Sequence, residues 1–526
     1  MRTLFFNGKI YTNKQFYQAM IVDEDKIVAV GDNDLQEDGN RYQVAIDLEQ
    51  RLVLPGFNDS HLHLFHQAKK ATIANLNAAK SIDEVIEIGK KHLANHPNLS
   101  VLIGEGFNQD KFNNPIIPTK VDLDLISKEI PIVFSRICGH IVVVNSKALK
   151  LCGIKEHTKV EKGQVLLDDK HQPNGILTEN ACALVGKFAS SFDPETATKL
   201  LMDAVNYALS YGVTSIQTND LSKDKSSSNI DELLYAYQQV ANKKIIRVNQ
   251  QVTTSSIDQY LEIKKAFIFN DYHNIGPLKV FLDGSLGART AALTTVYHDD
   301  KATKGVACYQ FDQLQTLVSE ANKKQVQLIF HAIGNQAIND VVTAFASSND
   351  KNNPLRHGIV HLQITDKKVL NRLHENNICA LVQPAFLDYD MGIVEERVGK
   401  ELASTSYAFH TMIETIPTSF GTDLPVEEIN PFHGIYLAVT RRNFQKTKIY
   451  NNHQFVTRCQ AIDAYTIGSS YQEFMENKKG LLEVGYFADF IIVDRDVFTI
   501  PLEEIYKTNV LTTYVGGKKV YSAKTT

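Results

Sequence analysis

The sequence predicts an α/β fold in which a (β/α)8 barrel carries a small β-sandwich built from both ends of the chain. Three observations predict it. Eight apolar, strand-like runs alternate with helical patterns through the middle of the chain, and short β-prone runs crowd both termini. The 526 residues also exceed what one compact core holds, so a barrel of ~250 residues plus accessory parts is the natural division.

The two termini are each too short to bury their own apolar faces. At the start, Thr3–Phe6 and Lys9–Thr12 flank Asn7-Gly8, a dipeptide that predicts a β-hairpin. At the end, residues 488–494, 510–515 and 518–521 are β-prone as well. We therefore expect residues 1–57 and 475–526 to pair as one composite β-sandwich, rather than as two unrelated appendages.

Residues 58–474 are expected to form the barrel. The first strand ends at His61, and the others cover residues 213–217, 245–250, 278–283, 326–331, 358–361, 378–383 and 418–423. Eight parallel strands with intervening helices form a (β/α)8 barrel, whose active site lies at the carboxyl ends of the strands.

About 150 residues separate the first two strands, several times the length of a normal βα unit. This stretch has its own helical and strand-like patterns, including a capping box at Ser81 and Glu84. We predict that residues 66–208 form an inserted subdomain, and because it leaves the catalytic end of strand one, we expect it to overhang the site.

Composition excludes several classes of protein. With 43% hydrophobic residues, 22% charged residues and a net charge of -5, the chain has no basic block for nucleic acid or a membrane surface. The first residues have no apolar segment of signal-peptide length. The six cysteines include no Cys-x-x-Cys and are expected to be buried free thiols in a reducing compartment, so we expect a cytoplasmic location.

Metal-competent side chains stand at the ends of separate predicted strands. They are His61 and His63 on the first, Lys279 and Asp283 on the fourth, His331 on the fifth, His361 on the sixth and Asp423 on the eighth. Alternation along each strand places His331 with Ile329, and His361 with Ile359, on the face that lines the cavity. Four imidazoles and a carboxylate in one cavity are costly unless they are solvated or bind a metal. A divalent metal is the simplest solution, and zinc or a similar ion suits such ligands. Taken singly, His331 reads as a satisfied buried histidine, His361 as a helix-facing group and Asp423 as a helix cap.

Several motifs together resemble the amidohydrolase superfamily. They are Pro55-Gly56-Phe57-x-Asp59-x-His61-x-His63, the run from Lys279 to Ser285, His331-Ala332-Ile333-Gly334, His361, Gly421 to Pro425, and Gly485-x-x-Ala488-Asp489. The long insertion and the run from Asp283 to Thr290 resemble the family-3 branch, which includes N-substituted formamide deformylases. This resemblance implies a distorted (β/α)8 (TIM) barrel with a terminal β-sandwich. The insertion differs from the family's in having Phe107 and Phe112 where tryptophans are expected.

The resemblance also implies a reaction: hydrolysis of a C–N bond in an amide, N-formyl or N-acyl amine or cyclic amide, by water that a metal activates. It implies that His61, His63, Lys279, His331, His361 and Asp423 bind one or two Zn²⁺ ions, with Mn²⁺ or Fe²⁺ as alternatives, and that Asp423 is the catalytic proton carrier.

A bare ammonium at Lys279 would be repelled by the ions, so its pKa should fall and the neutral amine become available. The resemblance implies that this amine takes up CO2 as a carbamate whose oxygens bridge two metals. The alternative is an ion pair between Lys279 and Asp283 or Asp423. Glu179 is a rival carboxylate, although it lies within the insertion.

His140, Asp283 and Arg289 are the candidates for contact with a small-molecule substrate, and Asp59 is expected to orient a histidine. Other functions stay open on the same site: an ester, lactone or phosphoester hydrolase, a metal-dependent isomerase or lyase, and a silent binding protein. A homodimer is expected on general grounds alone.

Overall fold

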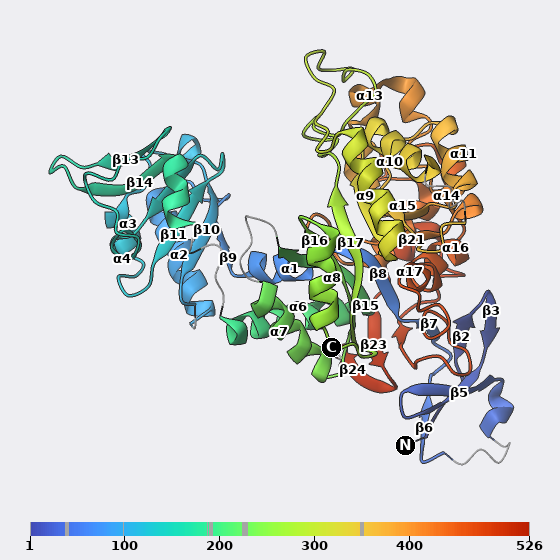
Figure 1. Cartoon of the computed structure of the whole chain (residues 1–526). Coiled ribbons are helices and arrows are strands. Elements are labelled where there is room, and N and C mark those ends of the chain that lie inside the picture. The colour runs from blue at the N-terminus through green and yellow to red at the C-terminus, as the bar shows by residue number, and fades with distance from the viewer. Residues whose placement is uncertain are drawn as a thin grey trace. The chain divides into compact units, whose positions relative to one another are not determined.

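The computed structural model describes residues 2–36, 42–97, 99–186, 188, 193–223, 230–347 and 352–524. The chain forms two compact units, one of residues 1–65, 197–226 and 233–526, the other of residues 66–196 and 227–232 (Figure 1). No helix in the described part of the chain is long and apolar enough to cross a membrane.

The larger unit contains eight parallel strands in one sheet, in the order β21-β20-β19-β18-β17-β16-β15-β8. All eight strands predicted from the sequence are present. Their bounds are β8 Phe57–Leu62, β15 Val213–Lys223, β16 Arg247–Thr254, β17 His273–Phe281, β18 Leu328–Ala332, β19 Gly358–His361, β20 Cys379–Val382 and β21 Thr418–Phe420.

Helices follow the strands in the βα alternation that the sequence predicts. They are α6 Pro194–Ser210, α7 Ile230–Asn242, α8 Ile257–Ala266, α9 Phe311–Lys324, α10 Asn335–Ser347, α11 Lys367–Glu375, α14 Phe409–Thr415, α15 Pro431–Thr440, α16 Arg458–Ala464 and α17 Ile467–Gln472. Polar caps start several of them: Ser256 accepts the Gln259 N–H at α8, and Asp366 accepts the Val369 N–H at α11. Such caps fix where each helix begins, and hence the length of the loop before it.

The first and last strands of the barrel meet just beyond their carboxyl ends. The Asp423 N–H donates to the His61 carbonyl at 2.8 Å, and the His63 N–H donates to the Leu424 carbonyl at 2.7 Å. The fold is therefore the predicted (β/α)8 barrel. These two hydrogen bonds bring residues more than 350 positions apart in the sequence next to each other.

Both chain termini build the predicted β-sandwich. One sheet has the order β5-β4-β1-β6 and the other β24-β23-β22-β7-β2-β3. Between them pack Phe5, Val53, Phe490 and Tyr514, with the last two rings stacked at 4.4 Å. The bounds are β1 Thr3–Phe6, β2 Lys9–Thr12, β3 Gln15–Tyr17, β4 Ala19–Asp23, β5 Lys26–Gly31, β6 Val44–Asp47, β7 Leu52–Pro55, β22 Phe490–Val493, β23 Val510–Val515 and β24 Lys518–Ser522.

The hairpin expected at Asn7-Gly8 is wrong. Strand β1 pairs with β4 and β6, whereas β2 pairs with β3 and β7 in the opposite sheet. The turn carries the chain across the sandwich instead, with Asn7 in the left-handed region at φ 55° and Gly8 so close to Leu48 that a Cβ would clash. Because the chain crosses from one sheet to the other here, Phe5 and Ile10 lie in the same core between the two sheets.

The smaller unit has a six-stranded sheet, β13-β14-β12-β11-β10-β9. Its bounds are β9 Ile73–Asn75, β10 Leu102–Phe107, β11 Ile132–Arg136, β12 Ile141–Val144, β13 Gly163–Leu167, β14 Pro173–Glu179, α2 Ile82–Asn95, α3 Lys120–Asp124 and α4 Ser146–Leu151. Ser81 caps α2 as predicted, but Glu84 accepts from the N–H of Lys80 rather than that of Ser81. Phe107 and Phe112 belong to the buried core of this unit.

All six cysteines are free, as expected. Their expected burial is wrong for five of them, because only Cys379, inside the barrel, is buried.

Candidate metal centre

Four imidazole rings stand in a row at the carboxyl ends of β8, β18 and β19. The ring centroids of His63 and His61 lie 5.2 Å apart, those of His61 and His361 5.7 Å, and those of His361 and His331 4.5 Å. Four histidines that the sequence spreads over 300 positions therefore lie next to one another at one end of the barrel.

Each of these rings uses its Nδ1 atom to contact a supporting group. The contacts are His61 with Gln251 Oε1 at 2.5 Å, His63 with the Asn219 carbonyl at 2.8 Å, His331 with Asp283 Oδ1 at 3.1 Å and His361 with Gln383 Oε1 at 2.8 Å. All four partners are oxygens, so each Nδ1 is placed to donate a proton and each Nε2 is left for a different contact. A neutral imidazole held in this way is the form that binds a metal.

The two glutamines are themselves held in place. Gln251 donates its amide to the Ser60 carbonyl at 2.9 Å, and Gln383 donates to the Leu381 carbonyl at 3.0 Å. The amide oxygens must then face the rings. Burial lowers the pKa of His61 and of His361 well below the usual value. The nearby Lys279 lowers the pKa of His61 further, and His331 does the same for His361.

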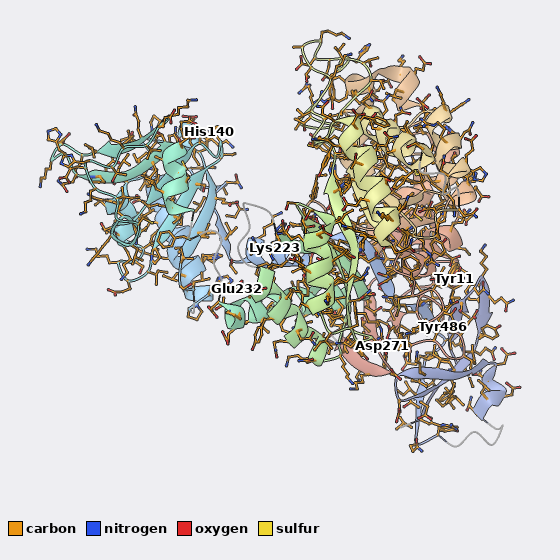
Figure 2. The ribbon with its side chains drawn as sticks, in the orientation of Figure 1. Tyr11, His140, Lys223, Glu232, Asp271 and Tyr486 are labelled. Carbon is orange, nitrogen blue, oxygen red and sulfur yellow. The ribbon has the colours of Figure 1, made fainter. Side chains whose placement is uncertain are left out.

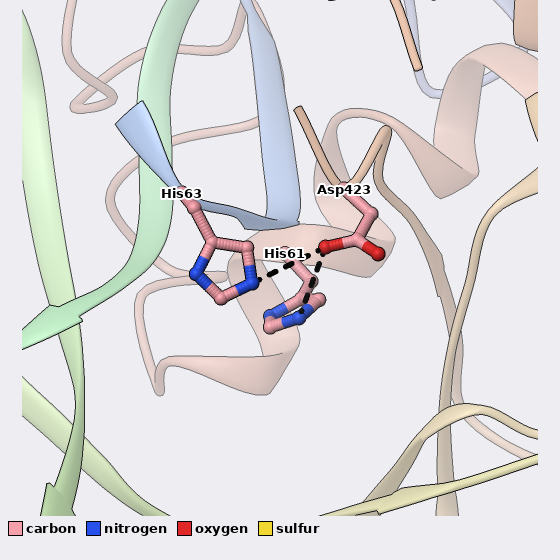
Figure 3. A group of neighbouring side chains, drawn as sticks. All are labelled: His61, His63 and Asp423. Carbon is pink, nitrogen blue, oxygen red and sulfur yellow. Dashed lines mark ion pairs between the residues drawn. The ribbon is translucent and has the colours of Figure 1, made fainter. Parts of the chain in front are cut away.

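Asp423 completes the group at one end of the row. Its Oδ1 lies 3.3 Å from His63 Nε2 and 3.5 Å from His61 Nε2, as Figure 3 shows. The ligand atoms of these three residues all lie within 4.8 Å of one another. Asp423 is buried, yet within the described chain its Oδ1 has no hydrogen-bond partner. An orphaned buried carboxylate oxygen beside two imidazole nitrogens fits a cation.

The sequence led us to expect that Asp59 orients a histidine ring, and this expectation is wrong. Its carboxylate accepts the backbone N–H groups of His61 and Thr422 and the Thr422 hydroxyl. It therefore holds the two chain segments that carry His61 and Asp423 at a fixed distance.

Lys279 lies inside the barrel with its Nζ 3.2 Å from His61 Nε2 and 5.2 Å from the centre of the Phe281 ring. Across the described residues it forms no ion pair with Asp283 or Asp423, the alternative that the sequence left open. Burial lowers the pKa of Lys279 to about 7, although the charge of Asp423 acts in the opposite direction.

His361 lies beside the other imidazoles as predicted, but strand alternation is not the reason. In the parallel register His331 is the partner of Val360, and Ala332 is the partner of His361, so Val360 rather than Ile359 shares the interior face. Alternation alone would turn His361 toward the helices. Its backbone adopts the left-handed region instead, at φ 77°, and the ring joins the row.

Asp283 contacts His331 through the ring Nδ1. Besides the ring it accepts the backbone N–H groups of Ile333, Gly334 and Ala292, and its side chain is fully buried. This geometry gives Asp283 a positioning role and does not support the predicted contact with substrate. Arg289 is likewise engaged, in an ion pair with Asp299 at 2.8 Å.

His140 belongs to the smaller unit, where Figure 2 labels it, in the turn between β11 and β12. It is exposed and its Nδ1 lies 2.9 Å from Glu179 Oε2, so Glu179, the rival carboxylate, pairs within its own unit.

Fold and site together define a class. A (β/α)8 barrel with four histidines held at Nδ1, a buried lysine and an orphaned carboxylate at its strand ends is the architecture of a metal-dependent enzyme.

Comparison with known proteins gives the family. The model of the Amidohydrolase family matches residues 44–521. The "Putative amidohydrolase YtcJ" of Bacillus subtilis is 30% identical over 99% of both chains, and the N-substituted formamide deformylase of Arthrobacter pascens is 23% identical over 95% of this chain and 94% of its own. The crystal structure of an uncharacterized metal-dependent hydrolase from Pyrococcus furiosus superposes with a TM-score of 0.78, at 26% identity, over 95% of this chain and 100% of that one. The chain belongs to the amidohydrolase family.

Proposed function

We propose that this protein hydrolyses a C–N bond in an amide, an N-formyl or N-acyl amine or a cyclic amide. The observation that carries the proposal is Asp423, a buried carboxylate with an unpartnered oxygen 3.3 and 3.5 Å from two histidine nitrogens. Cleaving a C–N bond requires a proton for the departing nitrogen, and a carboxylate held there can deliver it. The similarity to an N-substituted formamide deformylase supports the choice of bond.

We propose that one set of residues binds the metal and that Asp423 transfers the proton. One or two divalent ions would be held by His61, His63, His331, His361, Lys279 and Asp423, with zinc preferred by this donor set and Mn²⁺ or Fe²⁺ as alternatives. When bound, the ion supplies a water of lowered pKa and polarises the carbonyl. Asp423 takes a proton from the attacking water and returns it to the nitrogen, while Asp59 and Gln251 keep its neighbours in place.

Lys279 is proposed to act as a carbamate, formed when its neutral amine takes up CO2. The amine is buried and lies 3.2 Å from His61 Nε2, where a carbamate would place two oxygens able to bind cations. Protein prepared with ¹³C-bicarbonate should show a carbamate carbon signal that Lys279→Met removes. An unmodified lysine at full metal occupancy would end this part of the proposal.

The function is tested by stripping the protein of metal, reloading it with Zn²⁺ or Mn²⁺ and offering matched substrates. N-acyl amines, N-formyl amines, cyclic amides and the ester of the same acyl group form the panel. We expect turnover of amides by the loaded protein and none by the stripped protein. Hydrolysis of the esters alone would overturn the assignment to C–N bonds.

The free state of all six cysteines supports a reducing compartment, and the cytoplasm is the proposed location. A homodimer is proposed as the working assembly, with light scattering of the purified protein as its test.

A further inference from the structure

Two phenylalanine rings border the end of the imidazole row that is remote from Asp423. Phe281 ends β17 as the register partner of His331, and their ring centroids lie 5.5 Å apart. Phe386, in the short helix η4 (Pro384–Phe386) after β20, stacks on His361 at 5.7 Å with an interplanar angle of 15°. The row of imidazoles thus has a carboxylate at one end and two aromatic rings at the other.

Phe281 is exposed, although the residues on either side of it in the chain are buried. Its side chain is 39% exposed, whereas the neighbouring Val280 and Leu282 are 5% and 3% exposed. A large ring left in water beside a polar centre loses hydrophobic stabilisation that an apolar ligand group can restore. Single exposed apolar residues are common, so the position of this one, in contact with His331, is what makes it informative.

The reaction fixes which part of a substrate lies at which end. Asp423 must reach the departing nitrogen, so the amine lies at the end of the row formed by His61 and His63. The substituent on the carbonyl carbon then points the other way, toward His331 and His361. Phe281 and Phe386 stand there.

We propose that the acyl part of the substrate is an apolar group larger than formyl, packed on Phe281 and Phe386, and that Phe281 determines this specificity. The inference rests on the C–N hydrolysis proposed above and narrows it. A formyl group carries only hydrogen on its carbonyl carbon and would leave the two rings uncovered, so the substrate differs here from what the name of the Arthrobacter relative indicates.

The kinetic test compares the N-phenylacetyl and N-formyl derivatives of one amine, propylamine. We expect the wild-type protein to have the lower KM for the phenylacetyl compound. Phe281→Ala should raise that KM about tenfold, the effect of losing one buried apolar contact, and change the KM for the formyl compound less than twofold. Phe281→Leu, which keeps an apolar side chain, should lie between the two.

Phe269→Ala is the matched control. Phe269 is also an exposed phenylalanine, at 53%, but it precedes β17 and so lies at the opposite end of the barrel, and its loss should change neither KM. A preference for the formyl compound, or equal losses on both compounds in Phe281→Ala, would overturn the inference.

A binding measurement separates this inference from the function on which it rests. Calorimetric titration with phenylacetate and with formate needs no turnover, and Phe281→Ala should weaken phenylacetate binding about tenfold while formate binding stays unchanged. Phenylacetate binding that depends on Phe281 in a protein that cleaves no amide would refute the function and keep the aromatic subsite. Amide cleavage with phenylacetate binding that ignores Phe281 would refute the subsite alone.

Discussion

His357 and His361 are buried histidines at the two ends of strand β19, and their ring nitrogens are treated differently. His357 accepts the Leu328 N–H at Nδ1 and donates from Nε2 to Asn322, so both nitrogens are used. His361 uses Nδ1 for Gln383 and keeps Nε2 toward the other imidazoles. Burial therefore does not distinguish a ligand from a structural histidine. The free nitrogen does, and it appears only when the partners of each ring are known.

Two buried carboxylates at opposite ends of the barrel, Glu473 and Asp423, differ in the same way: within the described chain one has all its partners and the other has an unpartnered oxygen. Glu473 pairs with Lys479 at 2.7 Å and accepts the Asn58 amide at 2.6 Å, a satisfied arrangement far from the strand ends that bear the site. Asp423 has an oxygen that no donor reaches among the described residues. A protein keeps such an atom at a cost in stability, which indicates a role in binding or catalysis.

The largest effect on turnover should come from replacing the Asp423 carboxylate with an amide, with the same replacement at Glu473 as the comparison. Asp423→Asn should lower kcat about 10³-fold, because the amide cannot carry the proton, yet leave bound metal near the wild-type level. Glu473→Gln should keep kcat and reduce only stability. Kinetics and metal analysis on the same preparations measure both, and loss of metal from Asp423→Asn would make Asp423 chiefly a ligand.

A smaller effect is expected from the residues that hold the imidazoles. Gln251→Ala and Gln383→Ala remove the acceptors that fix His61 and His361, and should weaken metal affinity 10- to 100-fold in competition with a chelator. Gln217→Ala is the control, since its amide donates to the Ser469 carbonyl and touches no ring. Equal losses in all three variants would mean that general destabilisation, rather than ring orientation, sets the affinity.

The sequence was sufficient for the barrel strands because each is an apolar run closed by turn residues, a pattern that local physics imposes. It also singled out the histidines and Asp423, because polar side chains directly after such runs are conspicuous. It could not find Gln251. Gln250 and Gln251 are adjacent and chemically identical, and a register shift between Gln250 and Val252 decides which of them meets His61.

The position of His361 was beyond sequence reasoning for a related reason. Alternation along β19 assumes regular backbone, and the left-handed conformation of His361 reverses the side on which its ring falls. The turn at Asn7-Gly8 failed similarly, because its residues favour a tight turn in general and do not say which sheet the next strand joins. Local preferences are readable in the sequence, whereas bulges and crossings depend on partners distant in the chain.

The smallest predicted effect is on stability and concerns His357, the structural histidine of the pair His357 and His361. Burial lowers the pKa of His357 to about 4, so the folded protein keeps the ring neutral while the unfolded chain protonates it near the ordinary value of about 6.5. The unfolded state then binds more protons between these two pKa values, and stability falls as the pH drops through that window. His357 should account for about 1 kcal/mol of the stability lost between pH 7 and pH 5.5.

Guanidinium unfolding of His357→Gln at both pH values measures this share, because the amide keeps a donor and an acceptor but does not titrate. The wild type should lose about 1 kcal/mol more than the variant over this interval, and His157→Gln, an exchange of an exposed histidine, should behave as the wild type does. Equal losses in the wild type and His357→Gln would mean that the ring is already protonated in the folded protein. Leu328 N–H could not then donate to it, and the contrast between His357 and His361 would not hold.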